Sequence, residues 1–238
     1  MKRYGRLPAL LACLWLAPAG AGEHAHMVDD PVLGKFMIDA FEVRDMEGDN
    51  PVKWDVEAWL GRDLRKLWLK SEGRRSDGAT NAAELELLYS RAVAPYWDVQ
   101  AGWRADLEPD PRRDWLALGL RGTAPYHIEI DAALFVGEAG RTALRFKAEY
   151  ELRLSRRLIL GPELEANAYG EDDPALGIGS GLSTVQGGLR LYYQIARQFS
   201  PYVGIEGRRR FGATEDFARS GDRRPDDTWL LAGVRAWF

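Results

Sequence analysis

Apolar and charged residues alternate along most of the chain from about residue 35 onward. The clearest stretch, residues 144–154, has six apolar residues at every second position and five charged residues between them. Successive side chains of a β-strand face opposite sides, so such a stretch forms one apolar and one polar surface. A helix would scatter the five charges around its axis. The pattern therefore predicts β-strands with two unlike faces.

Twelve stretches follow this pattern, each close to the roughly 9–11 residues with which a tilted strand crosses a membrane. Short turns, as at residues 155–157, alternate with long loops at residues 170–181 and 214–227. We therefore expect an all-β fold, a transmembrane antiparallel up-and-down β-barrel of about 12 strands. The strands are predicted at residues 35–44, 53–61, 64–72, 82–91, 96–106, 113–122, 125–136, 141–154, 157–169, 183–196, 201–211 and 228–238.

The direction of the apolar face distinguishes a membrane barrel from a soluble one. A lipocalin-like barrel alternates as well, but its apolar face points inward. The last predicted strand has apolar residues at positions 230, 232, 234, 236 and 238 and ends on an aromatic residue, which is typical of outer-membrane barrels that pair their first and last strands. Aromatic residues near strand ends would form the interfacial girdle of such a barrel: Trp54, Trp97, Trp103, Tyr126 and Trp237.

The first 21 residues have the three parts of a secretory signal peptide. Lys2, Arg3 and Arg6 precede a short apolar core at residues 7–16, and the small residues 19–21 follow the A-x-A cleavage pattern. Cys13 could instead be the lipid-modified cysteine of a lipoprotein signal, but too little apolar sequence precedes it. We expect a signal peptide at 1–21, a short periplasmic segment at 22–33 and an outer-membrane β-barrel at 34–238, in a Gram-negative bacterium.

Removal of this leader changes the chemistry that remains. The chain has one cysteine, Cys13, so the mature protein would have neither a disulfide nor a thiolate metal site. The leader contains three of the 32 basic residues, and the 29 that remain face 36 acidic residues. Such a negative surface excludes nucleic acid as an expected partner. Lipid of the outer membrane is the expected one.

Seven ordered motifs follow one another along the chain, at residues 67–73, 88–91, 96–102, 124–126, 177–182, 201–204 and 232–238. Together they resemble the copper resistance protein B family, and the match runs from about residue 33 to the end of the chain. The resemblance implies an outer-membrane barrel that acts in periplasmic copper tolerance alongside a periplasmic multicopper oxidase. Members of the family often have a long N-terminal segment rich in Met and His, which shrinks here to residues 22–30.

The short N-terminal segment still contains three candidate copper ligands. Cleavage after Ala21 would leave Gly22-Glu23-His24 as the free terminus. An amine, two backbone amides and the His24 imidazole can together surround Cu(II) in a square plane. His26 and Met27 lie next to this set, and imidazole and thioether suit Cu(I). The alternative is that the two histidines lie near the leader junction by chance.

His127 is the histidine of the barrel body, and its position in the alternation predicts that it faces the lumen together with Glu129 and Asp131. It is either a copper ligand supported by a carboxylate or a lumen histidine hydrogen-bonded to one. The predicted metal ligands are therefore His24, His26, Met27, His127 and Glu129. Copper, as Cu(I) or Cu(II), would be bound as cargo.

The other lumen positions are heavily charged. Opposite charges on neighbouring strands would pair and make a narrow barrel rigid, or surplus carboxylates would give cations a path. A barrel of this size is nearly filled by its side chains, which favours a plugged or gated lumen. The expected lumen residues are Asp55, Glu57, Glu84, Glu86, Asp98, Glu129, Asp131, Glu149, Glu151, Glu163, Glu165, Glu206, Arg104, Arg121, Arg145, Lys147, Arg190, Arg208 and Arg235.

Three kinds of function fit an outer-membrane barrel. A lipid enzyme would need a serine beside a histidine on the lipid-facing surface, whereas the barrel histidine, His127, is expected to point inward. We therefore predict that the protein is not an enzyme. The sequence favours a barrel in copper resistance that binds copper and assists its export or sequestration. The alternative is a general outer-membrane pore or structural barrel without copper specificity.

Overall fold

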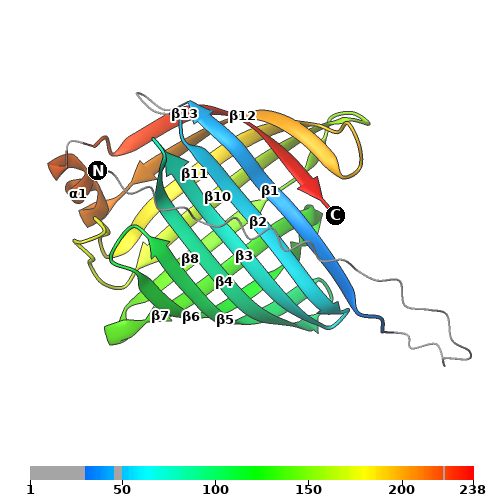
Figure 1. The fold of residues 1–238 in the computed structure, drawn as a ribbon, viewed down its shortest axis with the longest axis horizontal. Coiled ribbons are helices and arrows are strands. Elements are labelled where there is room, and N and C mark those ends of the chain that lie inside the picture. Colours follow the sequence, from blue (N-terminus) through cyan, green and yellow to red (C-terminus); the bar gives the residue numbers. More distant parts are fainter. Residues whose placement is uncertain (1–29, 46–49, 222) are drawn as a thin grey trace, which may run out of the picture. The chain divides into compact units, whose positions relative to one another are not determined.

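The computed structural model of the 238-residue chain describes residues 30–45, 50–221 and 223–238. Its larger compact unit, Val32–Phe238, is a closed barrel of antiparallel strands (Figure 1). The smaller unit, Met1–Pro31, lies almost entirely outside the described residues. The predicted signal peptide and the ligands His24, His26 and Met27 therefore lie outside them too.

The predicted all-β barrel of twelve strands is confirmed, with one strand interrupted. β8 and β9 both pair with β10 and follow one another in the chain, so they form a single broken strand. Each strand pairs with its neighbour in the chain, as in an up-and-down barrel. The strands are β1 (Leu33–Asp45), β2 (Val52–Arg62), β3 (Arg65–Ser76), β4 (Ala79–Ala94), β5 (Trp97–Glu108), β6 (Arg113–Ala124), β7 (Ile128–Gly137), β8 (Thr142–Glu149), β9 (Leu152–Arg153), β10 (Leu158–Tyr169), β11 (Gly181–Tyr193), β12 (Phe199–Arg210) and β13 (Asp226–Trp237).

The seam of the barrel joins β1 to β13. Met37 lies opposite Trp237, and the register continues to Asp45 opposite Leu230. Beyond the ladder, the Phe36 and Phe238 backbones exchange two hydrogen bonds of 3.0 and 2.8 Å. This pairing satisfies the backbone groups of both edges, which an apolar solvent would leave without partners. Figure 1 shows β13 (red) lying along β1 (blue).

The two ends of the barrel differ in the length of their connections. Short turns join β2 to β3, β4 to β5, β6 to β7 through the 3₁₀ turn Pro125–His127 (η1), and β9 to β10. Leu33 and Phe238 lie at this same end. The other end has one equally short turn, between β3 and β4, but also the longest connections, those from β10 to β11 and from β12 to β13, the latter with the α-helix Gly212–Ser220 (α1). Because outer-membrane barrels have short periplasmic turns and longer extracellular loops, the short-turn end is periplasmic.

Side-chain contacts hold the extracellular connections together. The Thr214 hydroxyl in α1 lies 2.9 Å from the Ser183 hydroxyl, and it accepts a 2.8 Å hydrogen bond from the Gly179 amide. In the loop between β10 and β11, the Ser180 amide donates a 2.6 Å hydrogen bond to Asp172, which lowers the pKa of that carboxyl. These contacts fix the loop and α1 to the strand ends.

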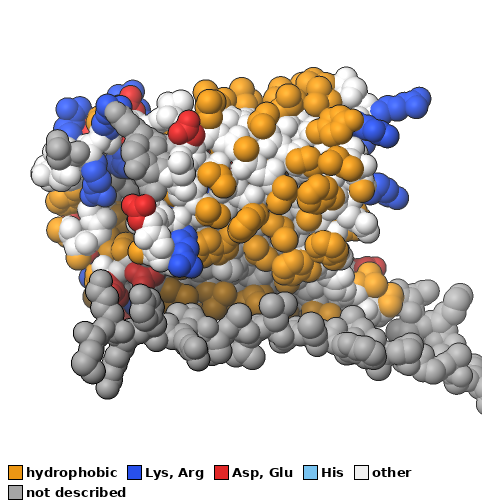
Figure 2. Space-filling view, turned by 45° about the horizontal axis from the view of Figure 1, so that its top comes forward, with side chains coloured by type: hydrophobic (Ala, Val, Ile, Leu, Met, Phe, Trp, Pro, Cys, Tyr) orange, Lys and Arg blue, Asp and Glu red, His pale blue; other side chains and the backbone are white. Residues whose placement is uncertain are grey.

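The apolar face of each strand points outward, as the alternation predicts. Leu116, Val203 and Leu230 are 68%, 59% and 60% exposed, although all three lie in the middle of strands. Figure 2 shows apolar side chains (orange) over the middle of the barrel and charged side chains mainly toward its two ends. Such a belt fits a lipid environment. No helix in the described ranges is long and apolar enough to cross a membrane.

Two details of the predicted strands are wrong. Trp237, expected in the outward aromatic girdle, lines the lumen because it shares the inward face of β13 with Arg235. The seventh strand was expected to begin at residue 125, but β7 begins at Ile128. Tyr126 and His127 instead adopt the left-handed conformation, with φ of 68° and 64°, and form the turn that reverses the chain.

Candidate cation site in the barrel lumen

The periplasmic half of the lumen contains a cavity of about 800 Å³. At the short-turn end it begins among residues such as His127, Arg153 and Trp237. It extends inward as far as Phe135, Glu84 and Arg145 near the middle of the barrel. The cavity therefore lies on the periplasmic side and does not reach the extracellular connections.

A β-bulge in β1 directs Asp39 into this cavity. On β2, Val56 lies opposite Ile38 and the next residue, Asp55, lies opposite Ala40, so Asp39 is the extra residue of the pair. The register with β13 shifts at the same place. An extra residue reverses the alternation, so the inward positions are odd-numbered before the bulge and even-numbered after it, as the burial of Glu42 shows.

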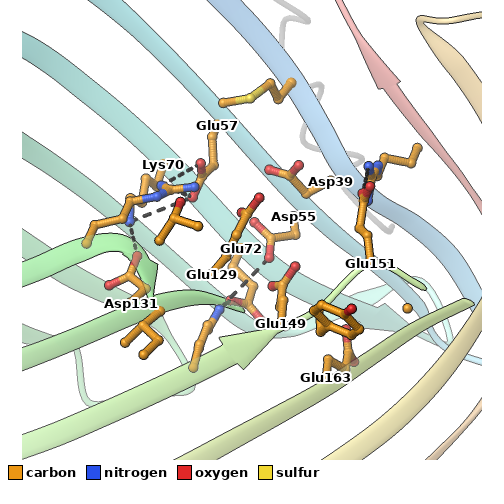
Figure 3. A pocket seen from close by; sticks show the side chains of 18 of the residues that line it. Asp39, Asp55, Glu57, Lys70, Glu72, Glu129, Asp131, Glu149, Glu151 and Glu163 are labelled. Atoms are coloured by element: carbon orange, nitrogen blue, oxygen red, sulfur yellow. Dashed lines mark hydrogen bonds and ion pairs between the residues drawn. The ribbon is translucent and has the colours of Figure 1, made fainter. Parts of the chain in front are cut away.

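Three carboxylates in the cavity make no direct ion pair within the described part of the chain. Asp39, Glu129 and Glu149 make no hydrogen bond or ion pair with any residue in these ranges. They come from β1, β7 and β8. Glu129 and Glu149 lie directly opposite each other in the ladder between β7 and β8, and Figure 3 shows Asp39 among the same lining carboxylates. Among the described residues, the negative charge of this part of the lumen therefore has no direct partner.

Other charged groups in the cavity pair across the lumen. Arg121 on β6 donates two hydrogen bonds of 2.8 and 3.0 Å to Glu57 on β2. Lys70 on β3 binds Asp131 on β7 at 2.8 Å. The expected pairs between neighbouring strands also occur, as between Lys53 and Glu72 at 3.0 Å. The two pairs across the lumen were not expected, because they join strands that are not neighbours in the sheet. These ion pairs therefore cross the lumen and narrow it.

A second set of contacts crosses the interior at the inner end of the cavity. Arg145 on β8 donates hydrogen bonds of 2.7 and 2.8 Å to the two carboxylate oxygens of Glu84 on β4. Arg104 on β5 binds the same Glu84 at 2.8 Å, and its guanidinium lies 4.5 Å from the centre of the Phe135 ring. Phe135 is 2% exposed. These four residues fill one side of the barrel interior.

The opposite side of the interior is filled by a buried ion cluster. Arg190 on β11 binds Glu42 on β1 at 3.1 Å and Glu206 on β12 at 2.8 Å. Arg44 binds the same two carboxylates at 2.7 and 3.2 Å, and the Tyr202 hydroxyl donates to Glu42 at 2.8 Å. The four charged side chains are at most 4% exposed. Water therefore scarcely reaches this cluster from either end.

The predicted ligands of the barrel body lie near the mouth of the cavity but not in a compact metal site. His127 lines the cavity from the exposed η1 turn, and Glu129 lines it from the start of β7. Asp131, expected beside them, is paired with Lys70. In residues 30–45, 50–221 and 223–238, no three His, Cys, Asp or Glu side chains lie close enough together to hold one metal ion.

Comparison with known proteins identifies relatives of the whole barrel. The family model described as "Copper resistance protein B precursor (CopB)" matches residues 32–238. The chain is 42% identical over 214 residues to the copper resistance protein B homolog of Pseudomonas syringae pv. tomato, covering 90% of this chain and 73% of that protein. It is 41% identical over 214 residues to copper resistance protein B of Escherichia coli, covering 90% of this chain and 72% of that protein.

Solved structures show the same fold at low identity. The NanC porin aligns with a TM-score of 0.57 and 10% identity, covering 86% of this chain and 99% of the porin. The KdgM porin aligns with a TM-score of 0.52 and 12% identity, covering 87% of this chain and 99% of the porin. Both likenesses support an outer-membrane barrel.

Proposed function

Because the chain belongs to the copper resistance protein B family and folds as an outer-membrane barrel, we propose that it binds copper ions as cargo on the periplasmic side and assists their sequestration or export. The observation that carries the proposal is the periplasmic cavity with Asp39, Glu129 and Glu149, which have no direct cation partner among the residues that the structure describes. In the described ranges these carboxylates and His127 do not form a compact ligand set, so their part would be to attract the cation by charge. Carboxylate oxygens and an imidazole suit Cu(II) better than Cu(I).

The N-terminal segment would supply a second, chemically different set of ligands. The His24 site with its terminal amine suits Cu(II), whereas His26 and Met27 suit Cu(I). Residue 33 lies at the periplasmic end of the barrel. A segment that ends there would hold copper on the same side as the cavity mouth, so both sets of ligands would draw on copper in the periplasm.

The side chains that occupy the lumen favour sequestration of copper over its free passage through the barrel. The contacts among Glu84, Arg104, Arg145 and Phe135 and the cluster around Arg190 occupy much of the interior at the inner end of the cavity. An ion that entered from the periplasm would have to break these contacts to leave on the other side. Oxidation of copper would belong to a partner, a periplasmic multicopper oxidase. We infer no enzymatic role for the barrel itself.

The second candidate function is a general pore or a structural barrel without copper specificity. The porin-like fold supports it, whereas the filled interior opposes an open pore. A general pore should pass small ions of either charge through a planar bilayer. A barrel that sequesters copper should show little conductance and a measurable affinity for copper.

Copper binding by the refolded mature chain tests the proposal, with Cu(II) and Cu(I) titrated separately against competing chelators. The lumen variant Asp39→Asn/Glu129→Gln/Glu149→Gln should weaken Cu(II) binding by at least about tenfold, as loss of supporting groups does at other metal sites. The matched control Asp216→Asn/Glu138→Gln/Glu171→Gln removes the same charges from exposed positions. It should leave the affinity unchanged.

A second variant separates the two proposed locations. The variant His24→Ala/His26→Ala/Met27→Leu should lose Cu(I) binding and should retain the Cu(II) that the lumen holds. If both variants bind copper as well as the wild-type chain does, the proposed ligands are wrong. If the wild-type chain binds neither ion, the copper-binding proposal fails and the structural barrel becomes the better interpretation.

A further inference from the structure

A second, smaller cavity lies beside the large one at the periplasmic end of the lumen. Its volume is about 210 Å³, and it is lined by residues of β9 to β13 and of the turn between β11 and β12. Two of its lining residues are buried, Ile159 and Tyr192, which lie directly opposite each other on β10 and β11. Pockets for drug-sized ligands begin at about 300 Å³, so this cavity suits a small ion or a single ionic group.

Two arginines that line this cavity have no partner among the described residues. Arg153 is the last residue of β9 and lies directly opposite the buried Ile159, so its side chain is on the inward face. Arg197 comes from the turn between β11 and β12. Neither side chain makes a hydrogen bond, an ion pair or a ring contact within residues 30–45, 50–221 and 223–238. Two guanidinium groups therefore line one small cavity without a counter-ion from this part of the chain.

The carboxylate in the wall of the cavity is already bound. Glu151 is paired with Arg235, and Figure 3 shows Glu151 held in this way. The Arg235 guanidinium also lies 4.8 Å from the centre of the Tyr192 ring. Three arginines and this one glutamate are the charged residues of the lining. The small cavity therefore has a positive wall, whereas acidic residues outnumber basic ones around the large cavity.

The uncharged polar side chains of the lining are also able to donate hydrogen bonds. They are the amides of Gln194 and Gln198 and the hydroxyl of Ser200, and none of the three is hydrogen-bonded within the described part of the chain. The planar fork of arginine binds phosphate oxygens through two parallel hydrogen bonds. A phosphate group has more acceptor oxygens than a carboxylate, so it suits a set of donors that comes from several strands.

We infer that this small cavity binds a phosphate-type oxyanion from the periplasm, with Arg153 and Arg197 as its principal ligands. The inference is independent of copper binding. It rests on a cavity of suitable size, on two arginines without a partner in the described ranges, and on a wall whose carboxylate is already neutralised by Arg235.

The direction of Arg153 favours a soluble anion over the headgroup of a lipid. Successive residues of a strand face opposite sides, and Leu152, the residue before Arg153, lies opposite Leu160 on the outward face and is 43% exposed. Leu154, the residue after Arg153, is 51% exposed. A lipid in the surrounding leaflet would meet these leucines, whereas an anion dissolved in the periplasm can enter the mouth of the lumen directly.

Calorimetric titration of the refolded mature chain with inorganic phosphate, in a phosphate-free buffer without copper, tests the site. The variant Arg153→Gln/Arg197→Gln should bind phosphate at least about tenfold more weakly, because it removes the charge-assisted hydrogen bonds. The control Arg156→Gln/Arg157→Gln removes the same charge from exposed residues of the neighbouring turn that line neither cavity. It should lose less than about threefold, since salt screens charges that do not touch the anion.

Several outcomes would overturn the inference. They are the absence of phosphate binding by the wild-type chain at millimolar concentration, equal losses in the two double variants, and acetate binding as tight as phosphate binding. Displacement of the phosphate by phosphatidylglycerol in the micelles would instead identify a lipid headgroup as the ligand and would refute the soluble anion. If the double variant does not refold, Arg197→Gln alone, with Arg156→Gln as its control, tests the site from an exposed turn. Unchanged phosphate binding by Arg197→Gln would exclude it.

Discussion

Replacing Arg190 by methionine should destabilise the barrel by about 3–5 kcal/mol, the usual cost of removing one partner from a buried ion pair. Arg190 binds Glu42 at 3.1 Å and Glu206 at 2.8 Å and also pairs with Glu163. Its side chain is 3% exposed, and those of Glu42 and Glu206 are 0% and 4% exposed. Without Arg190, Arg44 alone would have to neutralise the two buried carboxylates of Glu42 and Glu206.

A matched substitution separates burial from charge. Arg235 also points into the lumen, but its pair with Glu151 is 34% and 38% exposed. Water screens such a pair, so its contribution is about 0–1 kcal/mol. Arg235→Met should therefore lower the free energy of unfolding by at most about 1 kcal/mol. It removes the same charge as Arg190→Met and leaves a similar side-chain volume.

The free energy of unfolding can be measured for both variants from the urea dependence of tryptophan fluorescence in phospholipid vesicles. The comparison is valid where both variants refold and unfold reversibly. If Arg190→Met and Arg235→Met lose the same stability to within about 1 kcal/mol, the difference in burial does not control these ion pairs. Burial would then not explain how the cluster around Arg190 stabilises the barrel.

Two further predictions concern closure and packing. The double variant Arg104→Ala/Arg145→Ala should give measurable conductance in planar bilayers where the wild-type barrel gives little; unchanged conductance would show that these residues do not close the lumen. Gly102→Ala should destabilise the barrel by about 3 kcal/mol, because a Cβ there would lie 2.0 Å from a carbonyl oxygen of the neighbouring strand. The control Gly119→Ala should be tolerated, because its Cβ would lie 3.5 Å from the nearest atom. Heat modifiability on gels checks both glycine variants, and equal stability would contradict the packing argument.

The strands and their faces could be predicted because alternation is a local property of the sequence. The burial of Glu86 and the exposure of Leu230 both agree with it. The bulge at Asp39 was missed, although a signal existed: lumen-type residues stand at odd positions up to Asp39 and at even positions from Glu42 onward. Such a change of parity between two charged positions marks an extra residue in one strand.

The partners of the lumen charges could not be predicted in the same way. Arg121 meets Glu57 and Lys70 meets Asp131 across the barrel. Which side chains face each other there depends on the number, tilt and stagger of all the strands, and none of these is a local property. The absence of a partner for Asp39, and hence its place in the candidate site, depends on the same global geometry.

The seam between β1 and β13 has a consequence for the folding of the chain. All other strand pairs join strands that are close in sequence, whereas the seam pairs Met37 with Trp237. Closing so long a loop has an entropic cost that hairpin contacts do not repay in advance. The hairpins can therefore form early, but the backbone groups of both edges wait for the last strand. Until then the molecule is an open sheet whose two edges can pair with other chains, so closure in the membrane competes with aggregation.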